Sequence, residues 1–227
     1  MVGVDLGVND VPIVGEPIAF GTGFIVLLFV LFSPILARYP VTLAHEGGHM
    51  LANLLTLRGT RYWNLKDNAD GETVAAGPGI WLTRIFSSFV AYIVPSFLGL
   101  AAAALIAAGN PWAVLLVSIV LSVLAVARSR NALAFLIPGL ITLGLGWLLI
   151  AGTPSLQAAF AVAIAWLLLL GGLLRIVRVL GGSGDSEDLR KMTLIPEFVW
   201  SLTWLFIGLV SLVVGAQLLL RPGYAIV

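Results

Sequence analysis

Cysteine is absent from the 227 residues of this chain, and histidine occurs only twice. Without cysteine there is no disulfide and no thiolate ligand, so any metal ion must be held by histidine and carboxylate groups. Charge is also scarce: 10% of the residues are charged and the formal net charge is +1. Because no run of Lys or Arg interleaved with aromatic residues is present, we expect no nucleic-acid partner.

Apolar residues take the place of the missing charge. They make up 60% of the chain, and the mean hydropathy is +1.08, far from that of an average soluble domain. A membrane-crossing helix needs about 20 apolar residues, and Pro, Gly or charged residues separate such segments. The sequence predicts an all-α polytopic membrane protein in a lipid bilayer, one domain over 1–227. Its seven expected transmembrane helices are 20–37, 41–57, 84–108, 112–127, 132–151, 155–180 and 196–220.

Two polar segments interrupt the apolar pattern. In the first, Asp70-Gly71 stands between short alternating stretches, which predicts a small β-hairpin after the second helix, with a plain loop as the alternative. The second, 181–193, is rich in glycine and charge, which is typical of a solvated connector.

The basic residues suggest an orientation. If seven helices alternate, the segments 58–84, 128–131 and 175–191 share one side, and cytoplasmic loops collect Lys and Arg. That side then holds most of the basic residues: Arg58, Arg61, Lys66, Arg84, Arg128, Arg130, Arg175, Arg178, Arg190 and Lys191. We therefore expect a protein of the cell membrane with a cytoplasmic N-terminus and an outside C-terminus.

Both histidines fall in one motif, His45-Glu46-Gly47-Gly48-His49, inside the second expected helix. Residues four apart share a helix face, so the two imidazoles can bind one zinc ion with Glu46 beside them. An inert buried pair is the alternative, but idle ionisable groups in a bilayer are costly.

A catalytic zinc site needs a third protein ligand, which here must be a carboxylate. The interiors of the four helices between 84 and 180 contain no Asp, Glu, Lys or His. The remaining candidates lie in the hairpin region, in the second polar segment and at the start of the last helix. Outside the hairpin they are Asp185, Glu187, Asp188 and Glu197.

Several motifs together resemble a branch of the site-2 protease superfamily of membrane metallopeptidases. They are Arg38-Tyr39-Pro40-Val41-Thr42, the His45–His49 motif, Asp70-Gly71-Glu72-Thr73, Ala91-Tyr92-Ile93-Val94-Pro95-Ser96-Phe97-Leu98-Gly99-Leu100, Arg130-Asn131, Asp185-Ser186-Glu187-Asp188-Leu189 and Thr193-Leu194-Ile195-Pro196-Glu197-Phe198-Val199-Trp200. The chain has no Leu-Asp-Gly, where better-known members carry the third ligand. Asp185 matches the Asp that this branch places ahead of its Thr-x-Ile-Pro segment, so the resemblance implies Asp185 as the ligand, with Asp188 and Glu187 next.

The resemblance implies a metalloendopeptidase that hydrolyses a membrane protein or peptide substrate within or near the bilayer. Zn²⁺ would be held by His45, His49 and Asp185, and Glu46 would act as general base. It also implies a hairpin over 61–76 whose edge pairs with an unwound substrate.

Other roles remain open from the residues. Asn53 is a possible partner of His49 or a helix-packing residue, and Asn131 a possible oxyanion donor or a helix cap. A non-catalytic metal-binding scaffold or sensor would carry the same motif. A metal transporter is disfavoured, because it needs polar groups along several helices.

Overall fold

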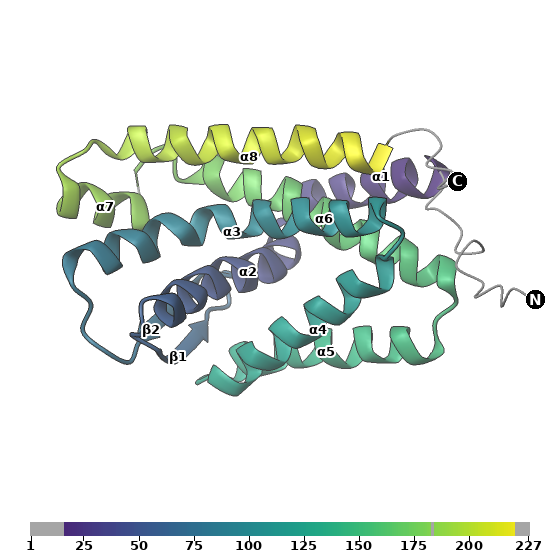
Figure 1. Cartoon of the computed structure of the whole chain (residues 1–227), viewed down its shortest axis with the longest axis horizontal. Coiled ribbons are helices and arrows are strands. Elements are labelled where there is room, and N and C mark those ends of the chain that lie inside the picture. The colour runs from purple at the N-terminus through teal and green to yellow at the C-terminus, as the bar shows by residue number, and fades with distance from the viewer. Residues whose placement is uncertain (1–15, 183, 221–227) are drawn as a thin grey trace, which may run out of the picture.

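The structure, a computed structural model, describes residues 16–182 and 184–220. The order of elements in these ranges is α1 (Glu16–Phe32), α2 (Pro34–Leu55), β1 (Thr60–Leu65), β2 (Gly71–Ala75), α3 (Trp81–Ala107), α4 (Pro111–Arg128), α5 (Ala132–Ala151), α6 (Pro154–Arg178), α7 (Asp185–Thr193) and α8 (Glu197–Leu220). Figure 1 shows α3, α6 and α8 running side by side along the long axis, with α4 and α5 paired below them. The two strands and the short helix α7 lie toward the end of the bundle opposite the α4 start.

Five helices, α3, α4, α5, α6 and α8, are long and apolar enough to cross a membrane. Their bounds lie within a few residues of those predicted, because the residues that mark helix starts in the sequence also begin these helices in the structure. Pro111 and Pro154 stand in first turns, where the missing N–H costs nothing. The Thr153 hydroxyl accepts a hydrogen bond from the N–H of Leu156, which caps α6.

The predicted boundary between the first two helices is wrong. The break falls at Ser33, where the chain bends by 106°, and Arg38-Tyr39-Pro40 lies inside α2. Pro34 begins α2 in the favoured first-turn position, and Pro40 removes one N–H without ending the helix. Since α1 and α2 count at most as one broken span, the described residues contain five or six candidate spans, and the predicted seven are not confirmed.

Small residues let α2 lie close to its neighbours. A Cβ on Gly48 would stand 2.7 Å from the Cα of Ala91 in α3, and one on Gly171 of α6 would collide with Val41. Such contacts between glycines and neighbouring backbones are typical of helices packed in membranes. The glycine inside the histidine motif therefore brings that motif against α3.

The predicted hairpin is present, as an antiparallel pair in which Leu65 lies opposite Gly71. Trp63 is fully buried and its indole N–H donates to the carbonyl of Ala125, 2.8 Å away. Asn131 caps α5 by accepting from Ala134 and also bonds both backbone groups of Leu65. Of the two roles considered for Asn131, the structure shows the cap, which at the same time ties β1 to the bundle.

The second polar segment differs from the solvated connector that was predicted, because residues 185–193 form the helix α7. Ser186 and Leu189, three residues apart, are buried on one face of it. The indole N–H of Trp81 donates to the carbonyl of Met192 at 2.7 Å, so α7 is also tied to the start of α3. This packing places Asp185, the first residue of α7, beside the histidine motif of α2.

Candidate metal centre

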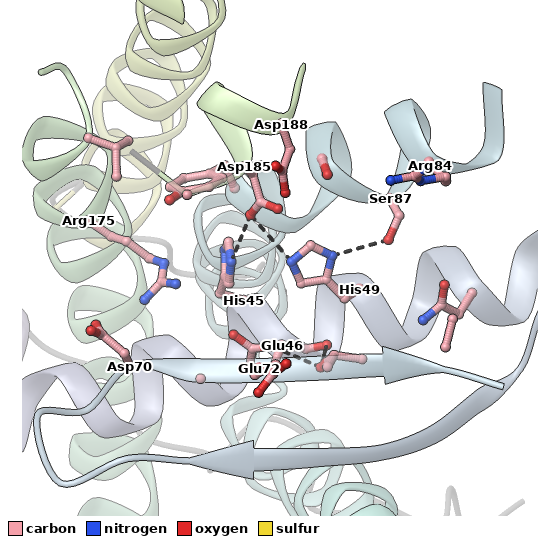
Figure 2. A pocket seen from close by; sticks show the side chains of 18 of the residues that line it. His45, Glu46, His49, Asp70, Glu72, Arg84, Ser87, Arg175, Asp185 and Asp188 are labelled. Atoms are coloured by element: carbon pink, nitrogen blue, oxygen red, sulfur yellow. Dashed lines mark hydrogen bonds and ion pairs between the residues drawn. The ribbon is translucent and has the colours of Figure 1, made fainter. Parts of the chain in front are cut away.

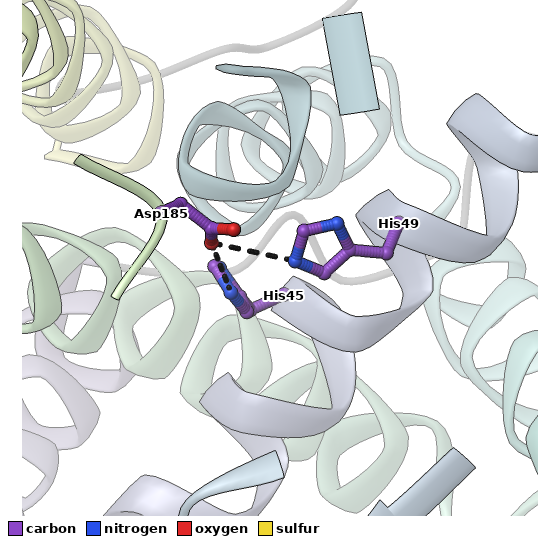
Figure 3. A group of neighbouring side chains, drawn as sticks. All are labelled: His45, His49 and Asp185. Atoms are coloured by element: carbon purple, nitrogen blue, oxygen red, sulfur yellow. Dashed lines mark ion pairs between the residues drawn. The ribbon is translucent and has the colours of Figure 1, made fainter. Parts of the chain in front are cut away.

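Two imidazoles of α2 point toward one carboxylate (Figure 3). The Oδ2 atom of Asp185 lies 3.3 Å from Nε2 of His45 and 3.4 Å from Nε2 of His49. One ligand atom from each of the three residues lies within 4.8 Å of the others. The structure thus brings together the two histidines of the motif and the aspartate implied by the resemblance.

These separations suit a tetrahedral metal ion. Nitrogen and oxygen ligands 2.0–2.2 Å from a tetrahedral zinc ion are roughly 3.3–3.6 Å apart, and both measured N–O distances fall in that interval. A donor set of two imidazoles and one carboxylate is also a known set of catalytic zinc sites. The two N–O separations and the chemistry of the donor set therefore fit a zinc ion held by His45, His49 and Asp185.

The surroundings of Asp185 favour its ionised form. Burial acts to raise the pKa of this carboxyl, but the adjacent His49 and His45 rings outweigh burial and hold the pKa well below its usual range. A carboxylate must be deprotonated to bind a metal ion. The direction of the pKa shift at Asp185 therefore favours the form that binds a metal ion.

The other carboxylates considered as ligands lie elsewhere. Asp188 lines the cavity beside the histidines but is not in the three-residue group. Glu187 pairs with Lys191 at 2.8 Å on the outer face of α7, and Glu197 pairs with Arg190 at 2.7 Å. In the hairpin, Asp70 pairs with Arg38.

Residues of α3 and α8 hold the imidazole rings. Nδ1 of His49 lies 3.1 Å from the hydroxyl oxygen of Ser87, so a ring that offers Nε2 to a metal donates its Nδ1 proton to Ser87. The His45 ring meets the ring of Tyr92 edge-on, with centroids 4.6 Å apart. Trp204 stacks on the other side of Tyr92 at 4.2 Å. No sequence pattern assigned Ser87, Tyr92 or Trp204 a role at the site.

Glu46 is 2% exposed and lies on the hairpin side of the histidines, whereas Asp185 lies on the opposite side (Figure 2). The hydroxyl of Thr73 in β2 donates to Oε2 of Glu46 at 2.8 Å. A cavity of about 660 Å³ opens here, lined by Glu46, both histidines, Asp185 and β2.

Two cations of α6, Arg175 and Arg178, line the same cavity. Arg175 donates from Nη1 to the hydroxyl of Thr42 at 2.9 Å, and its Cζ lies 5.6 Å from the centre of the Tyr92 ring. Its Nε is buried and has no hydrogen-bond partner among the described residues. In the sequence Arg175 and Arg178 indicate only an orientation, because arginines at a helix end are typical of a membrane interface.

Asn53, the possible partner of His49, lines the cavity one turn further along α2. Its side-chain oxygen has no hydrogen-bond partner within the described part of the chain. The residue bonded to His49 is instead Ser87.

The apolar helices are those of a membrane protein, and the cluster of two imidazoles and one carboxylate is a candidate metal site. The model of the Peptidase M50B-like family matches residues 20–215, so the chain belongs to this family, which is the site-2 protease family. Family membership suggests a metalloprotease. No curated protein and no solved structure matches the chain.

Proposed function

We propose that this protein is a zinc-dependent metalloendopeptidase that cleaves membrane-protein or peptide substrates within or near the bilayer. The observation that carries the proposal is the approach of Asp185 to both imidazoles of the His45–His49 motif inside one cavity. The match to the Peptidase M50B-like family supports the same activity.

In this proposal His45, His49 and Asp185 hold the metal ion. Zinc bound there supplies a Lewis acid that polarises the scissile carbonyl and lowers the pKa of water to about 7. Ser87 keeps the His49 ring in the tautomer that leaves Nε2 free to bind.

Glu46 acts as general base and then as general acid. Its carboxylate takes a proton from the attacking water and delivers it to the nitrogen of the leaving amine. Glu46 is buried, follows His45 in the sequence and lines the same cavity. In this proposal the Arg175 guanidinium, which lines the same cavity, stabilises the negative charge that develops on the carbonyl oxygen in the transition state.

The hairpin supports a route for substrate binding. Residues of β2 line the cavity next to Glu46 (Figure 2). A peptide bond inside a helix is shielded by its own hydrogen bonds, and pairing with a strand edge compensates for their loss once the helix unwinds. We infer that a substrate reaches the site as an extended segment beside β2.

We further propose a location in the cell membrane with the hairpin end of the bundle on the cytoplasmic side. The basic residues near 58–84, 128–131 and 175–191 support that side. The predicted positions of the N- and C-termini concern residues 1–15 and 221–227, which lie outside the described residues.

A reconstituted cleavage assay tests the proposal. Purified protein in proteoliposomes is incubated with a library of single-span peptides, and products are identified by mass spectrometry. Wild type should cleave, and Glu46→Gln should lose at least about a hundred-fold in rate, the lower end of what general acid–base catalysis contributes, while keeping its metal. If both proteins bind zinc and neither cleaves any peptide, a scaffold or sensor is the better description.

A further inference from the structure

The Asp70-Gly71-Glu72-Thr73 segment has no part in holding a metal ion, yet it lies against the proposed general base. We propose that this segment positions Glu46, with Thr73 as the positioning residue. The inference rests on the proposed function, since it concerns how the general base of that reaction is held.

Thr73 contacts Glu46 directly. Its hydroxyl lies 2.8 Å from Oε2 and 3.4 Å from the backbone carbonyl oxygen of the same residue. The single hydroxyl proton is therefore directed mainly to the carboxylate, which accepts the shorter bond. A hydrogen bond to one carboxylate oxygen fixes the rotation of the group and leaves the other oxygen, Oε1, free for a proton.

Gly71 allows Glu46 to come this close. A Cβ at Gly71 would stand 2.5 Å from Oε1 and 2.6 Å from both Cδ and Cγ of Glu46. Residues two apart in a strand face the same side, so Gly71 and Thr73 together form the surface on which the Glu46 side chain rests. Any larger residue at 71 would push the carboxylate from its position.

The turn of the hairpin is held by the helix that carries Glu46. Asp70 pairs with Arg38 at 2.6 Å, and the hydroxyl of Thr42, one turn before Glu46, donates to the carbonyl of Ala69 at 2.7 Å. Ala69 is fully buried and has a positive φ of 60°. The hairpin turn is therefore fixed directly to α2, and these contacts keep Thr73 beside Glu46.

The consequence for the reaction is a fixed orientation of the general base. A glutamate side chain has three rotatable bonds, and a proton acceptor must stand within hydrogen-bond reach of the attacking water. A hydrogen bond to a charged group is stronger than one between neutral groups. Loss of the Thr73 hydroxyl should therefore slow the chemical step about ten- to a hundred-fold.

The test compares Thr73→Val, Thr73→Ser and Gly71→Ala with wild type in proteoliposomes. Valine keeps the branched shape favoured in strands but removes the hydroxyl, whereas serine keeps the hydroxyl. Matched controls are Thr60→Val, in β1 opposite Ala75, and Gly77→Ala, where a Cβ meets the Arg58 carbonyl at an ordinary 3.4 Å. For each variant, kcat, KM, bound zinc and the thermal unfolding midpoint are measured.

We expect Thr73→Val to lower kcat about ten- to a hundred-fold with KM within about two-fold. Thr73→Ser should recover most of kcat, and Gly71→Ala should lower kcat at least as much as Thr73→Val. Both controls should behave as wild type, and all five variants should keep one zinc ion per chain.

The inference is overturned if Thr73→Val keeps wild-type kcat, or if serine restores no activity while folding and zinc content are intact. It is also overturned if Thr73→Val alters only KM, which would indicate substrate binding rather than positioning. Failure of the proposed function looks different: the wild type itself would not cleave, or Glu46→Gln would cleave as fast as wild type.

Discussion

Asp185 and His45 lie far apart in the chain, yet Oδ2 of the first stands 3.3 Å from Nε2 of the second. The helix α7 brings them together by packing against α3, which in turn packs against α2 through Gly48. The third side chain of the cluster depends on this indirect contact, so changes in α7 should act on the metal site.

Removal of Asp185 tests that dependence. Asp185→Ala should weaken zinc binding by more than the roughly 10–100-fold that loss of an outer-shell partner costs, because a direct ligand is lost. His45→Ala should do the same. Metal content after dialysis against a zinc buffer, measured by mass spectrometry, checks both variants.

Asp188→Ala is the matched control, since Asp188 is an acidic residue of the same short helix that lines the cavity without joining the cluster. It should retain full zinc. If Asp188→Ala loses zinc and Asp185→Ala keeps it, the ligand has been assigned to the wrong carboxylate.

Loss of the Ser87 hydroxyl should weaken zinc binding, because this hydroxyl contacts the ring of His49. When Nε2 of His49 binds the metal ion, the Nδ1–H of the ring donates to the serine hydroxyl, and loss of such a partner lets the ring turn or change tautomer. Ser87→Ala is expected to weaken zinc binding about 10–100-fold, measured by competition with a chelator. Ser88→Ala removes the neighbouring hydroxyl, which also lines the cavity, and should leave the affinity unchanged. Equal losses in the two variants would exclude a specific bond to His49.

Thr42 should contribute to the stability of the protein. It accepts a hydrogen bond from Arg175 and donates one to Ala69, and it is fully buried. Thr42→Val leaves both partners unsatisfied, so the free energy of unfolding in detergent should fall by about 1–3 kcal/mol.

Tyr39→Phe removes a hydrogen bond to the same hairpin turn, from Tyr39 to the carbonyl of Asp67, but an exposed one. Water replaces that bond, so the loss should be at most about 1 kcal/mol. A smaller effect for Thr42→Val than for Tyr39→Phe would contradict the buried network.

The elements that the sequence predicted well share a physical reason. Long apolar runs between prolines, glycines and charges have one stable form in a bilayer, and Asp70-Gly71 between alternating residues favours a hairpin. The histidine motif was recognisable because its spacing places both rings on one helix face.

The features that were not predicted depend on tertiary contacts. Arg38-Tyr39-Pro40 carries every sign of a helix boundary, yet the turn occurs at Ser33, and Arg38 extends to a hairpin formed later in the chain. Ser87 and Tyr92 are unremarkable in sequence because serine and tyrosine are common in membrane helices. Their importance comes from α3 passing over the histidines.

The orientation of the chain gives the last prediction. Figure 1 shows the first residues of α1 and the last residues of α8 at the same end of the bundle, opposite the hairpin. If α1 and α2 together form one broken span, the chain crosses six times, and the two ends of the described chain emerge on one side. Seven crossings would place them on opposite sides.

The absence of cysteine makes this measurable with single added thiols. Pro17→Cys, in the first turn of α1, Asn110→Cys and Thr153→Cys should all react with a membrane-impermeant maleimide added outside intact cells. Asn68→Cys, in the hairpin turn, should react only after lysis. The basic residues beside the hairpin make its side the cytoplasmic one. Asn110 belongs to the α3–α4 turn and Thr153 to the α5–α6 turn. Both turns lie at the end of the bundle opposite the hairpin (Figure 1), so these two residues provide the outside reference. Protection of Pro17→Cys together with Asn68→Cys would indicate an odd number of crossings, as the sequence predicted, and would require α1 and α2 to cross the membrane separately.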